Sequence, residues 1–141
     1  MKHTTDTLAV MLLLLLPVQF ASPATIQVPG DVPAIQAAID GASDGDEIVV
    51  APGLYVENIH FNGKNITLRS TDPSDPVVVD STVIDGKSDG SVVTFAGTEN
   101  ETCLLTGFTL MNGWSSRGAG ISGGGTQAAI DYYNVLLPEL Q

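Results

Sequence analysis

The sequence predicts an all-β domain built as a short parallel solenoid, in which each strand pairs with the strands one turn before and after it. Three observations favour this class over a sandwich or a barrel. The β-prone runs are short and joined by tight turns, apolar and polar residues alternate within them, and no crossover helices separate them. Each expected element is taken below in chain order.

The first element is a secretory signal peptide. Lys2 and His3 precede the apolar run 8–16, and Ser22-Pro23-Ala24 supplies a small-x-small cleavage site. The run is much shorter than the ~20 residues that cross a bilayer, so no membrane anchor is expected after cleavage. We expect a cut after Ala24 and a secreted or cell-surface domain, extracellular or periplasmic. A buried N-terminal helix is the alternative.

A strand at residues 25–28 and a helix at residues 33–42 open the mature domain. Asp31 is the expected N-cap, and Pro33 suits the first turn of the helix. The apolar residues at helical spacing form one face, and they are Ile35, Ala38 and Ile39. This segment is the only helix expected before residue 126.

Seven short β-prone runs follow, separated by turns rich in glycine, proline and aspartate. They cover residues 47–51, 54–61, 65–70, 77–80, 82–85, 92–95 and 104–112. In the last run, Phe108 and Leu110 are expected to face the core. Asn112 would then lie at an inside corner, where its amide could bond corner residues of neighbouring turns. An ordinary exposed turn is the alternative for Asn112.

The tail, residues 126–141, follows a glycine run and predicts a helix or an irregular segment. Its apolar residues form a rough helical face, and Pro138 would end the helix. Residues 127–131 repeat the letters QAAID of residues 36–40. This repeat marks either a second capping helix like the one at residues 33–42 or a coincidence. A third alternative is that the series of β-prone repeats was interrupted before the tail.

Three segments carry a resemblance to a known family. They read AIQAAID at 34–40, VVAPGLYVE at 49–57 and GFTLMNG at 107–113. The first two, with residues 44–46, resemble the opening of right-handed parallel β-helix proteins of the pectin-lyase-like superfamily. The third, with residues 64–70, resembles the first coils of these proteins, and residues 118–121 are similar to repeats of surface β-helix autotransporters. The resemblance implies a short right-handed parallel β-helix over residues 25–125, with the 33–42 helix as its N-terminal cap. It also implies that the chain is the N-terminal portion of a longer protein.

Charge and cysteine content exclude several function classes. The net charge of −11 argues against nucleic acid and anionic lipid as partners, because both need clustered Lys and Arg. Loss of residues 1–24 leaves this charge unchanged, since Lys2 and Asp6 leave together. Cys103 is the single cysteine, so no intramolecular disulfide forms. Its apolar surroundings favour a buried inert thiol over a nucleophile.

No catalytic residue is predicted. The sequence has no nucleophile elbow, phosphate-binding loop or Cys/His metal spacing. We find no match to the catalytic motifs of polygalacturonases, pectate lyases or pectin methylesterases. An enzymatic alternative stays open because three carboxylates are expected to face outward, those of Glu57, Asp80 and Asp85. Arg69 would be the positive partner for a uronate. That enzyme would be a pectate or pectin lyase, or a glycoside hydrolase, acting on acidic polysaccharide.

The candidate ligand-binding residues suit sugars. Trp114 and Tyr55 have aromatic rings that could stack on pyranoses, and Arg117 lies in the loop after Trp114. Arg69 and Glu57 complete this set as charged partners.

Acidic residues also leave room for weak calcium binding, although no cofactor is expected. The candidates are Asp80, Asp85 and Asp89. The segment Asp85-x-Lys87-x-Asp89-Gly90 fails as an EF-hand because Lys87 occupies a ligand position. Turns in which aspartate bonds its own backbone are the alternative.

Two sites fit the Asn-x-Thr glycosylation sequence, at Asn65 and Asn100. Only a eukaryotic secretory route would use them. The first lies in a predicted strand and the second in a predicted loop.

The sequence therefore favours a secreted non-catalytic module that binds polysaccharide or serves as a surface repeat scaffold. The enzyme described above is the alternative. An open edge of the stacked strands would also allow self-association.

Overall fold

The computed structural model describes residues 22–114, 120–123 and 129–136. Within these ranges the chain forms ten strands and two helices. In chain order they are β1 (Thr25–Val28), α1 (Ile35–Gly41), β2 (Glu47–Val50), β3 (Gly53–Tyr55), β4 (Ile59–His60), β5 (Thr67–Ser70), α2 (Pro76–Ser81), β6 (Thr82–Asp85), β7 (Val93–Thr94), β8 (Leu104–Met111), β9 (Ile121–Ser122) and β10 (Ala129–Leu136).

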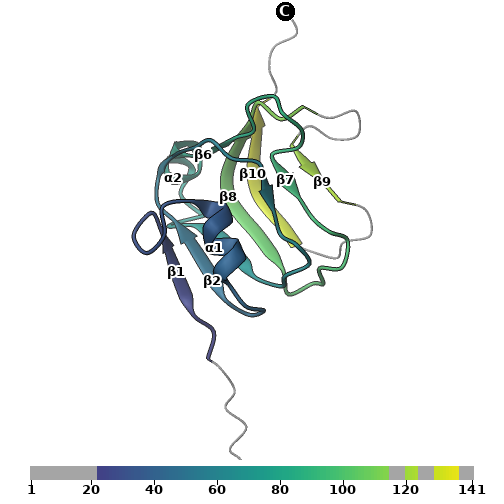
Figure 1. The fold of residues 1–141 in the computed structure, drawn as a ribbon. Helices are drawn as coiled ribbons and strands as arrows, with labels where there is room; N and C mark the ends of the chain where they lie inside the picture. Colours follow the sequence, from purple (N-terminus) through teal and green to yellow (C-terminus); the bar gives the residue numbers. More distant parts are fainter. Residues whose placement is uncertain (1–21, 115–119, 124–128, 137–141) are drawn as a thin grey trace, which may run out of the picture.

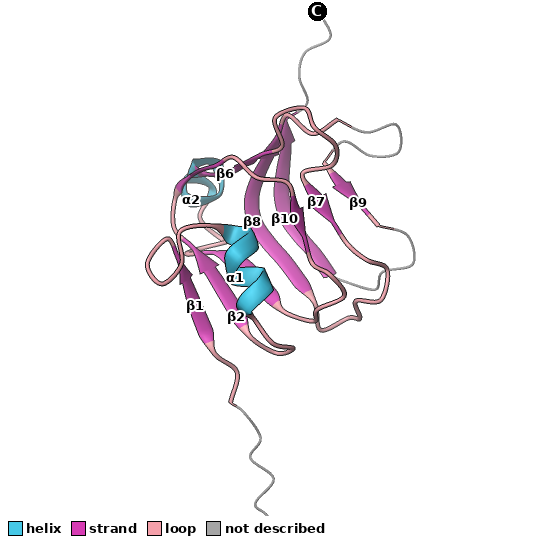
Figure 2. Cartoon of the chain, viewed as in Figure 1, coloured by secondary structure: helices cyan, strands magenta, loops and turns pink. Residues whose placement is uncertain are grey.

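The strands form two parallel sheets (Figures 1 and 2). The larger sheet has the order β1-β2-β5-β8-β6-β3, and β10 pairs with β8. The smaller sheet has the order β4-β7-β9. One hydrophobic core draws side chains from both sheets and from α1.

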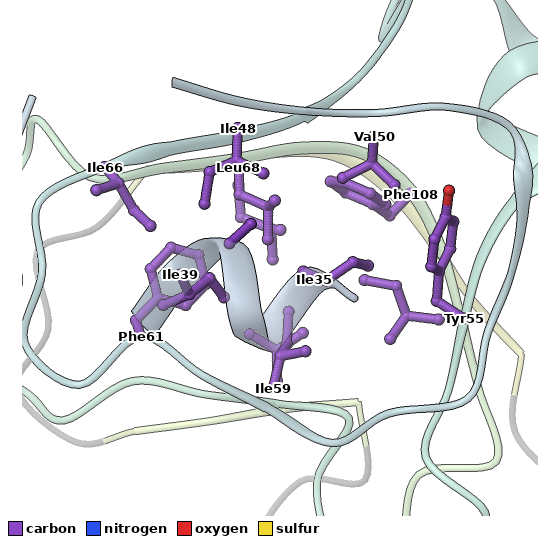
Figure 3. Packing of buried hydrophobic residues seen from close by; sticks show 14 of the residues in the cluster. Ile35, Ile39, Ile48, Val50, Tyr55, Ile59, Phe61, Ile66, Leu68 and Phe108 are labelled. Atoms are coloured by element: carbon purple, nitrogen blue, oxygen red, sulfur yellow. The ribbon is translucent and has the colours of Figure 1, made fainter. Parts of the chain in front are cut away.

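Buried aliphatic and aromatic side chains fill the space around α1. Figure 3 shows Ile48 and Leu68 of the larger sheet on one side of this helix and Ile59 of β4 on the other. Phe61 and Phe95 stack with ring centroids 4.5 Å apart. Phe108 and Leu110 are fully buried, as the alternation in their strand predicts.

Strand β8 joins the two halves of the larger sheet. Its first half pairs with β5 and its second half with β6. Gly107 lies between the two halves with φ +82°, in the left-handed region that favours glycine. A Cβ at this position would meet Ser70 Oγ at 2.3 Å and Pro73 Cα at 2.8 Å. The sheet therefore needs glycine where β8 changes partners.

The predicted all-β class and short solenoid are wrong. Ten strands in two parallel sheets combine with two helices, which is a mixed α/β arrangement. Residues 77–80, predicted as a strand, lie in α2. Asp75 caps this helix by accepting from the Val77 N–H at 2.9 Å, and Pro76 occupies its first turn. These two signals outweigh the β-propensity of the three valines.

The helix predicted for the tail is also wrong over residues 129–136, while residues 126–128 and 137–141 lie outside the described ranges. Residues 129–136 form β10, which runs parallel to β8 and pairs with it from Ala129↔Leu104 to Leu136↔Met111. The long edge of β8 offers partners for backbone groups along this whole segment, and tertiary pairing overrides the rough helical pattern. The last three of the repeated letters QAAID, residues 129–131, therefore belong to a strand and not to a helix like α1.

The helix predicted at residues 33–42 is present as α1 (Ile35–Gly41), but its expected cap is wrong. Ala34 is the N-cap, and it makes no side-chain cap hydrogen bond. The Asp31 carboxylate instead accepts from the Gln27 N–H at 2.8 Å.

Side chains far away in sequence cap α1 at both ends. Glu57 accepts from the Ile35 N–H at 3.0 Å and from the Gln36 N–H at 2.9 Å. At the other end the Lys64 ammonium donates to three carbonyls, those of Ile39, Asp40 and Ala42. Both charges have the sign that favours their end of the helix dipole. Within the described residues, no helix is long and apolar enough to cross a membrane.

Candidate functional site

The strongest candidate site lies where β3, β6 and β8 end. Tyr55, Ile84 and Leu110 lie in register on these three neighbouring strands. Because the strands are parallel, the segments that follow them leave the sheet at one edge. We call this surface, formed by Asn58, residues 85–91 and residues 112–114, the Trp114 edge.

Backbone hydrogen bonds hold the loops of the Trp114 edge together. The Trp114 N–H donates to the Gly90 carbonyl at 2.7 Å. The Asn112 carbonyl accepts from the Ser88 N–H at 2.6 Å, and the Met111 carbonyl accepts from the Gly86 N–H at 3.0 Å. The loop after β6 and the loop after β8 therefore form one unit.

Side-chain amides add further bonds. The Asn58 Nδ2 donates to the carbonyls of Asp89 and Ser91, both at 2.9 Å. The Asn112 Nδ2 donates to Asp85 Oδ1 at 3.0 Å, and the same oxygen accepts from the Lys87 N–H at 2.8 Å. Asn112 thus bonds Asp85, the residue that ends the neighbouring strand β6.

The backbone of the Trp114 edge is unusually strained. Lys87, Ser88 and Asn112 have φ values of 53°, 58° and 53°, in the left-handed region. Such conformations cost about 1–2 kcal/mol each for residues with a Cβ. They persist where surrounding contacts hold them, and they concentrate at binding sites.

Trp114 is the exposed centre of this surface. Its side chain is 68% exposed although its backbone is tied to Gly90. Lys87, Ser88 and Asp89 are exposed in the neighbouring loop. The two loops joined by the Trp114–Gly90 bond therefore present an exposed aromatic side chain, an ammonium, a hydroxyl and a carboxylate.

Not all predicted ligand residues join this surface. Arg69 lies in β5 and donates from Nε to Glu47 at 2.6 Å, with further bonds from Nη1 to the carbonyls of Ser70 and Thr71. The Arg69 guanidinium holds the pKa of Glu47 below its ordinary value, mainly through this hydrogen bond. Arg69 thus has a structural partner on the neighbouring strand β2.

Tyr55 and Glu57 serve the interior rather than an open surface. Tyr55 is buried and donates its hydroxyl to the Ala51 carbonyl at 2.9 Å. Burial, with a smaller contribution from the Glu57 charge, raises the pKa of this hydroxyl above its ordinary value. Both oxygens of Glu57 bind the first N–H groups of α1. Arg117 lies outside the described residues.

The three predicted calcium ligands do not meet. Asp80 lies in α2 before β6 begins, and Asp85 ends β6. Only Asp85 and the loop of Asp89 belong to the Trp114 edge. Among the described residues, no group of three or more His, Cys, Asp or Glu side chains is placed to hold a metal ion.

Sequence reasoning missed the role of Glu99. This side chain is 2% exposed and accepts from the N–H groups of Gly63, Ala96 and Gly97, each at 2.9 Å. Burial raises the pKa of its carboxyl, but these backbone donors outweigh burial and the net pKa lies below the ordinary value. Nearby glycines were the available signal, since a glycine-rich turn presents free N–H groups.

Cys103 is buried, as its apolar neighbours predict. Burial is the main cause that raises the pKa of its thiol to about 11. At neutral pH the sulfur is protonated and a poor nucleophile.

No protein-family model, no curated protein and no solved structure matches the chain. The resemblance of its opening segments to pectin-lyase-like proteins stays a prediction from the sequence.

Proposed function

We propose that the protein is a secreted, non-catalytic module that binds a neutral polysaccharide through the Trp114 edge. The observation that carries this proposal is the combination of a 68% exposed indole with a backbone fixed by the Gly90 bond. An exposed tryptophan costs solvation free energy in the isolated protein, and a backbone that is already held loses less entropy on binding. Such a side chain suits a ligand with an apolar face.

The chemistry of the edge supports a sugar as this ligand. A pyranose ring presents C–H groups on one face and hydroxyls around its rim. The indole of Trp114 suits the C–H face, while Lys87, Ser88 and Asp89 supply hydrogen-bond donors and acceptors for hydroxyls. In sheets of parallel strands, ligands commonly bind beyond the carboxyl ends of the strands.

The charge of the protein supports a neutral rather than an acidic polymer. The net charge of −11 repels polyanions at long range. The edge itself carries Asp85 and Asp89 against the single cation Lys87 among its described residues. Arg69, the cation expected to meet a uronate, is engaged with Glu47.

Binding to insoluble cellulose, mannan and starch, with polygalacturonate as the acidic comparison, tests the proposal. We expect depletion of the protein by at least one neutral polymer, with little dependence on salt. Trp114→Ala should weaken that binding roughly tenfold or more, and Trp114→Phe should weaken it less. Val77→Ala is the matched control, because Val77 is 73% exposed on α2, before β6 begins.

Three results would contradict the proposal. They are equal binding by Trp114→Ala and the unchanged chain, preference for polygalacturonate, and release of reducing or unsaturated sugar ends that Asp85→Ala abolishes. The last result would favour the enzymatic alternative.

Secretion is the second part of the proposal and depends on residues 1–24, of which residues 1–21 lie outside the described ranges. Ala24, the residue before the expected cut, donates its N–H to Asp46 at 2.8 Å and accepts from the Glu47 N–H at 2.8 Å. We expect the exported protein to begin at Thr25, as measured by intact mass. A soluble cytosolic product that keeps Met1 would contradict secretion.

A further inference from the structure

The structure distinguishes the two Asn-x-Thr sequences, and we infer that Asn100, and not Asn65, is an N-glycosylation site of the secreted protein. The inference rests on the secretory route in the proposed function and goes beyond it. It adds a covalent modification at a place distinct from the Trp114 edge.

Asn100 lies exposed in the loop between β7 and β8. Its Oδ1 accepts from the Thr102 N–H at 2.8 Å and from the Thr102 hydroxyl at 2.6 Å. The Asn100 side chain therefore closes a local turn with Thr102. The Asn100 N–H is held from outside this turn, because it donates to Asn65 Oδ1 at 2.7 Å. Among the described residues, no acceptor takes a hydrogen bond from Asn100 Nδ2, the nitrogen that would be modified.

Asn65 has different surroundings. It is half-buried, and its Oδ1 accepts from the Asn100 N–H at 2.7 Å. Its own N–H donates to Asp44 at 2.9 Å. Thr67, the third residue of this sequence, already belongs to β5 and donates its N–H to the Asp46 carbonyl at 3.0 Å. Asn65 is therefore engaged with two distant loops, and Thr67 is engaged in the sheet.

The chemistry of the transfer fits the turn at Asn100. The co-reactant is an oligosaccharide linked to a lipid through pyrophosphate. Nδ2 attacks C1 of the first sugar, the C1–O bond breaks, and the lipid pyrophosphate leaves with the bonding electron pair. Nδ2 loses one proton to a base of the transferring enzyme as the N–C1 bond forms. Hydrogen bonds donated to Oδ1 by Thr102 withdraw electron density from the amide and ease loss of that proton.

A glycan at Asn100 leaves the Trp114 edge accessible. Asn100 precedes β8 and Trp114 follows it. The eight residues of β8 span about 25 Å at 3.3 Å per residue. The modification and the proposed sugar ligand therefore lie at opposite ends of one strand.

Expression of the full chain in a eukaryotic secretory host tests the inference, with intact mass before and after enzymatic removal of N-glycans and peptide mapping of the deglycosylated asparagine. We expect one glycan, at Asn100. Asn100→Gln and Thr102→Ala should each remove it, whereas Thr102→Ser and Asn65→Gln should keep it. An unmodified Asn100 in a chain that has been secreted, or a glycan at Asn65, would overturn the inference.

A second form of the full chain, carrying an established secretory leader ahead of Met1, separates failure of the site from failure of the route. Glycosylation of this form alone would contradict secretion by the natural N-terminus and support Asn100 as the site. A chain that reaches the lumen with Asn100 unmodified would overturn the inference whatever the route. Removal of the glycan should leave polysaccharide binding unchanged, and a change would contradict the separation of the two surfaces.

Discussion

At the residue scale, the surroundings of a few residues are set by contacts with distant segments. Their neighbours in the sequence do not predict these contacts. Glu99 is buried against three backbone N–H groups, and one of them comes from Gly63, far earlier in the chain. Gly107 is pressed against Ser70 and Pro73. Each position therefore tolerates change poorly, and for a different physical reason.

Gly107→Ala is expected to destabilise the protein by about 2 kcal/mol or more, since left-handed strain adds to overpacking. The new methyl group would overlap Ser70 Oγ and the Pro73 backbone. The free energy of urea unfolding measures the effect. Gly41→Ala is the control, because a Cβ there meets nothing within 4 Å. If Gly107→Ala and Gly41→Ala had equal free energies of unfolding, position 107 would not require glycine.

Glu99 makes stability depend on pH. Its pKa is lowered in the folded protein, so its contribution is fully present above about pH 4.5, its ordinary value, and is lost as pH falls through the folded value. Glu99→Gln should lower the free energy of unfolding by about 1–3 kcal/mol at pH 7. It should also reduce the fall in that free energy as the pH drops below 4.5. Glu101→Gln, at an exposed neighbour, is the control. An unchanged fall of the free energy of unfolding in Glu99→Gln would refute this role.

At the element scale, helices and strands form where capping and pairing groups are available. The seven-residue helix α1 is too short to be stable alone. It depends on Glu57 and Lys64 at its two ends and on Ile35, Ala38 and Ile39 in the core. The valine-rich α2 likewise depends on its Asp75 cap.

Glu57→Gln is expected to lower stability by about 1 kcal/mol, because a neutral amide is a weaker partner for the N-terminal end of the α1 dipole. Lys64→Met should act in the same direction at the other end. Thermal unfolding of each variant measures the loss, with Lys87→Met as the control for removal of an exposed lysine. A loss in the control as large as in Lys64→Met would argue against capping.

At the scale of the whole molecule, β8 is the strand around which the larger sheet is built. It pairs with β5, β6 and β10. Strand β10 covers one complete edge of β8, and its removal would expose unpaired backbone groups. Exposed edges of this kind pair with other chains.

Deletion of residues 126–141 should therefore raise the fraction of oligomer or aggregate above that of the full chain. Size-exclusion chromatography with light scattering on the full chain and on the shortened chain measures the change. A monodisperse, folded monomer from the shortened chain would show that β10 does not protect the edge of β8. If the full chain self-associates to the same degree, the unpaired strand edge that joins the chains is not the edge of β8 that β10 covers.

Sequence alone was enough for features that depend on neighbours in the chain. The alternation at Phe108 and Leu110 identified their burial, and the spacing of Ile35, Ala38 and Ile39 identified α1 and its buried face. Apolar surroundings identified Cys103 as buried.

Tertiary structure alone decided what depends on partners far away in sequence. Residues 129–136 form a strand despite their helical pattern, because β8 pairs with the backbone groups that face it along the whole length of β10. Glu57, a candidate sugar ligand by sequence, became a helix cap because the chain brings it to Ile35. Arg69 of β5 forms an ion pair with Glu47 of the neighbouring strand β2. Trp114 is exposed, and its N–H donates to the Gly90 carbonyl. Local patterns report which groups need burial or pairing, but only the fold determines which partners satisfy them.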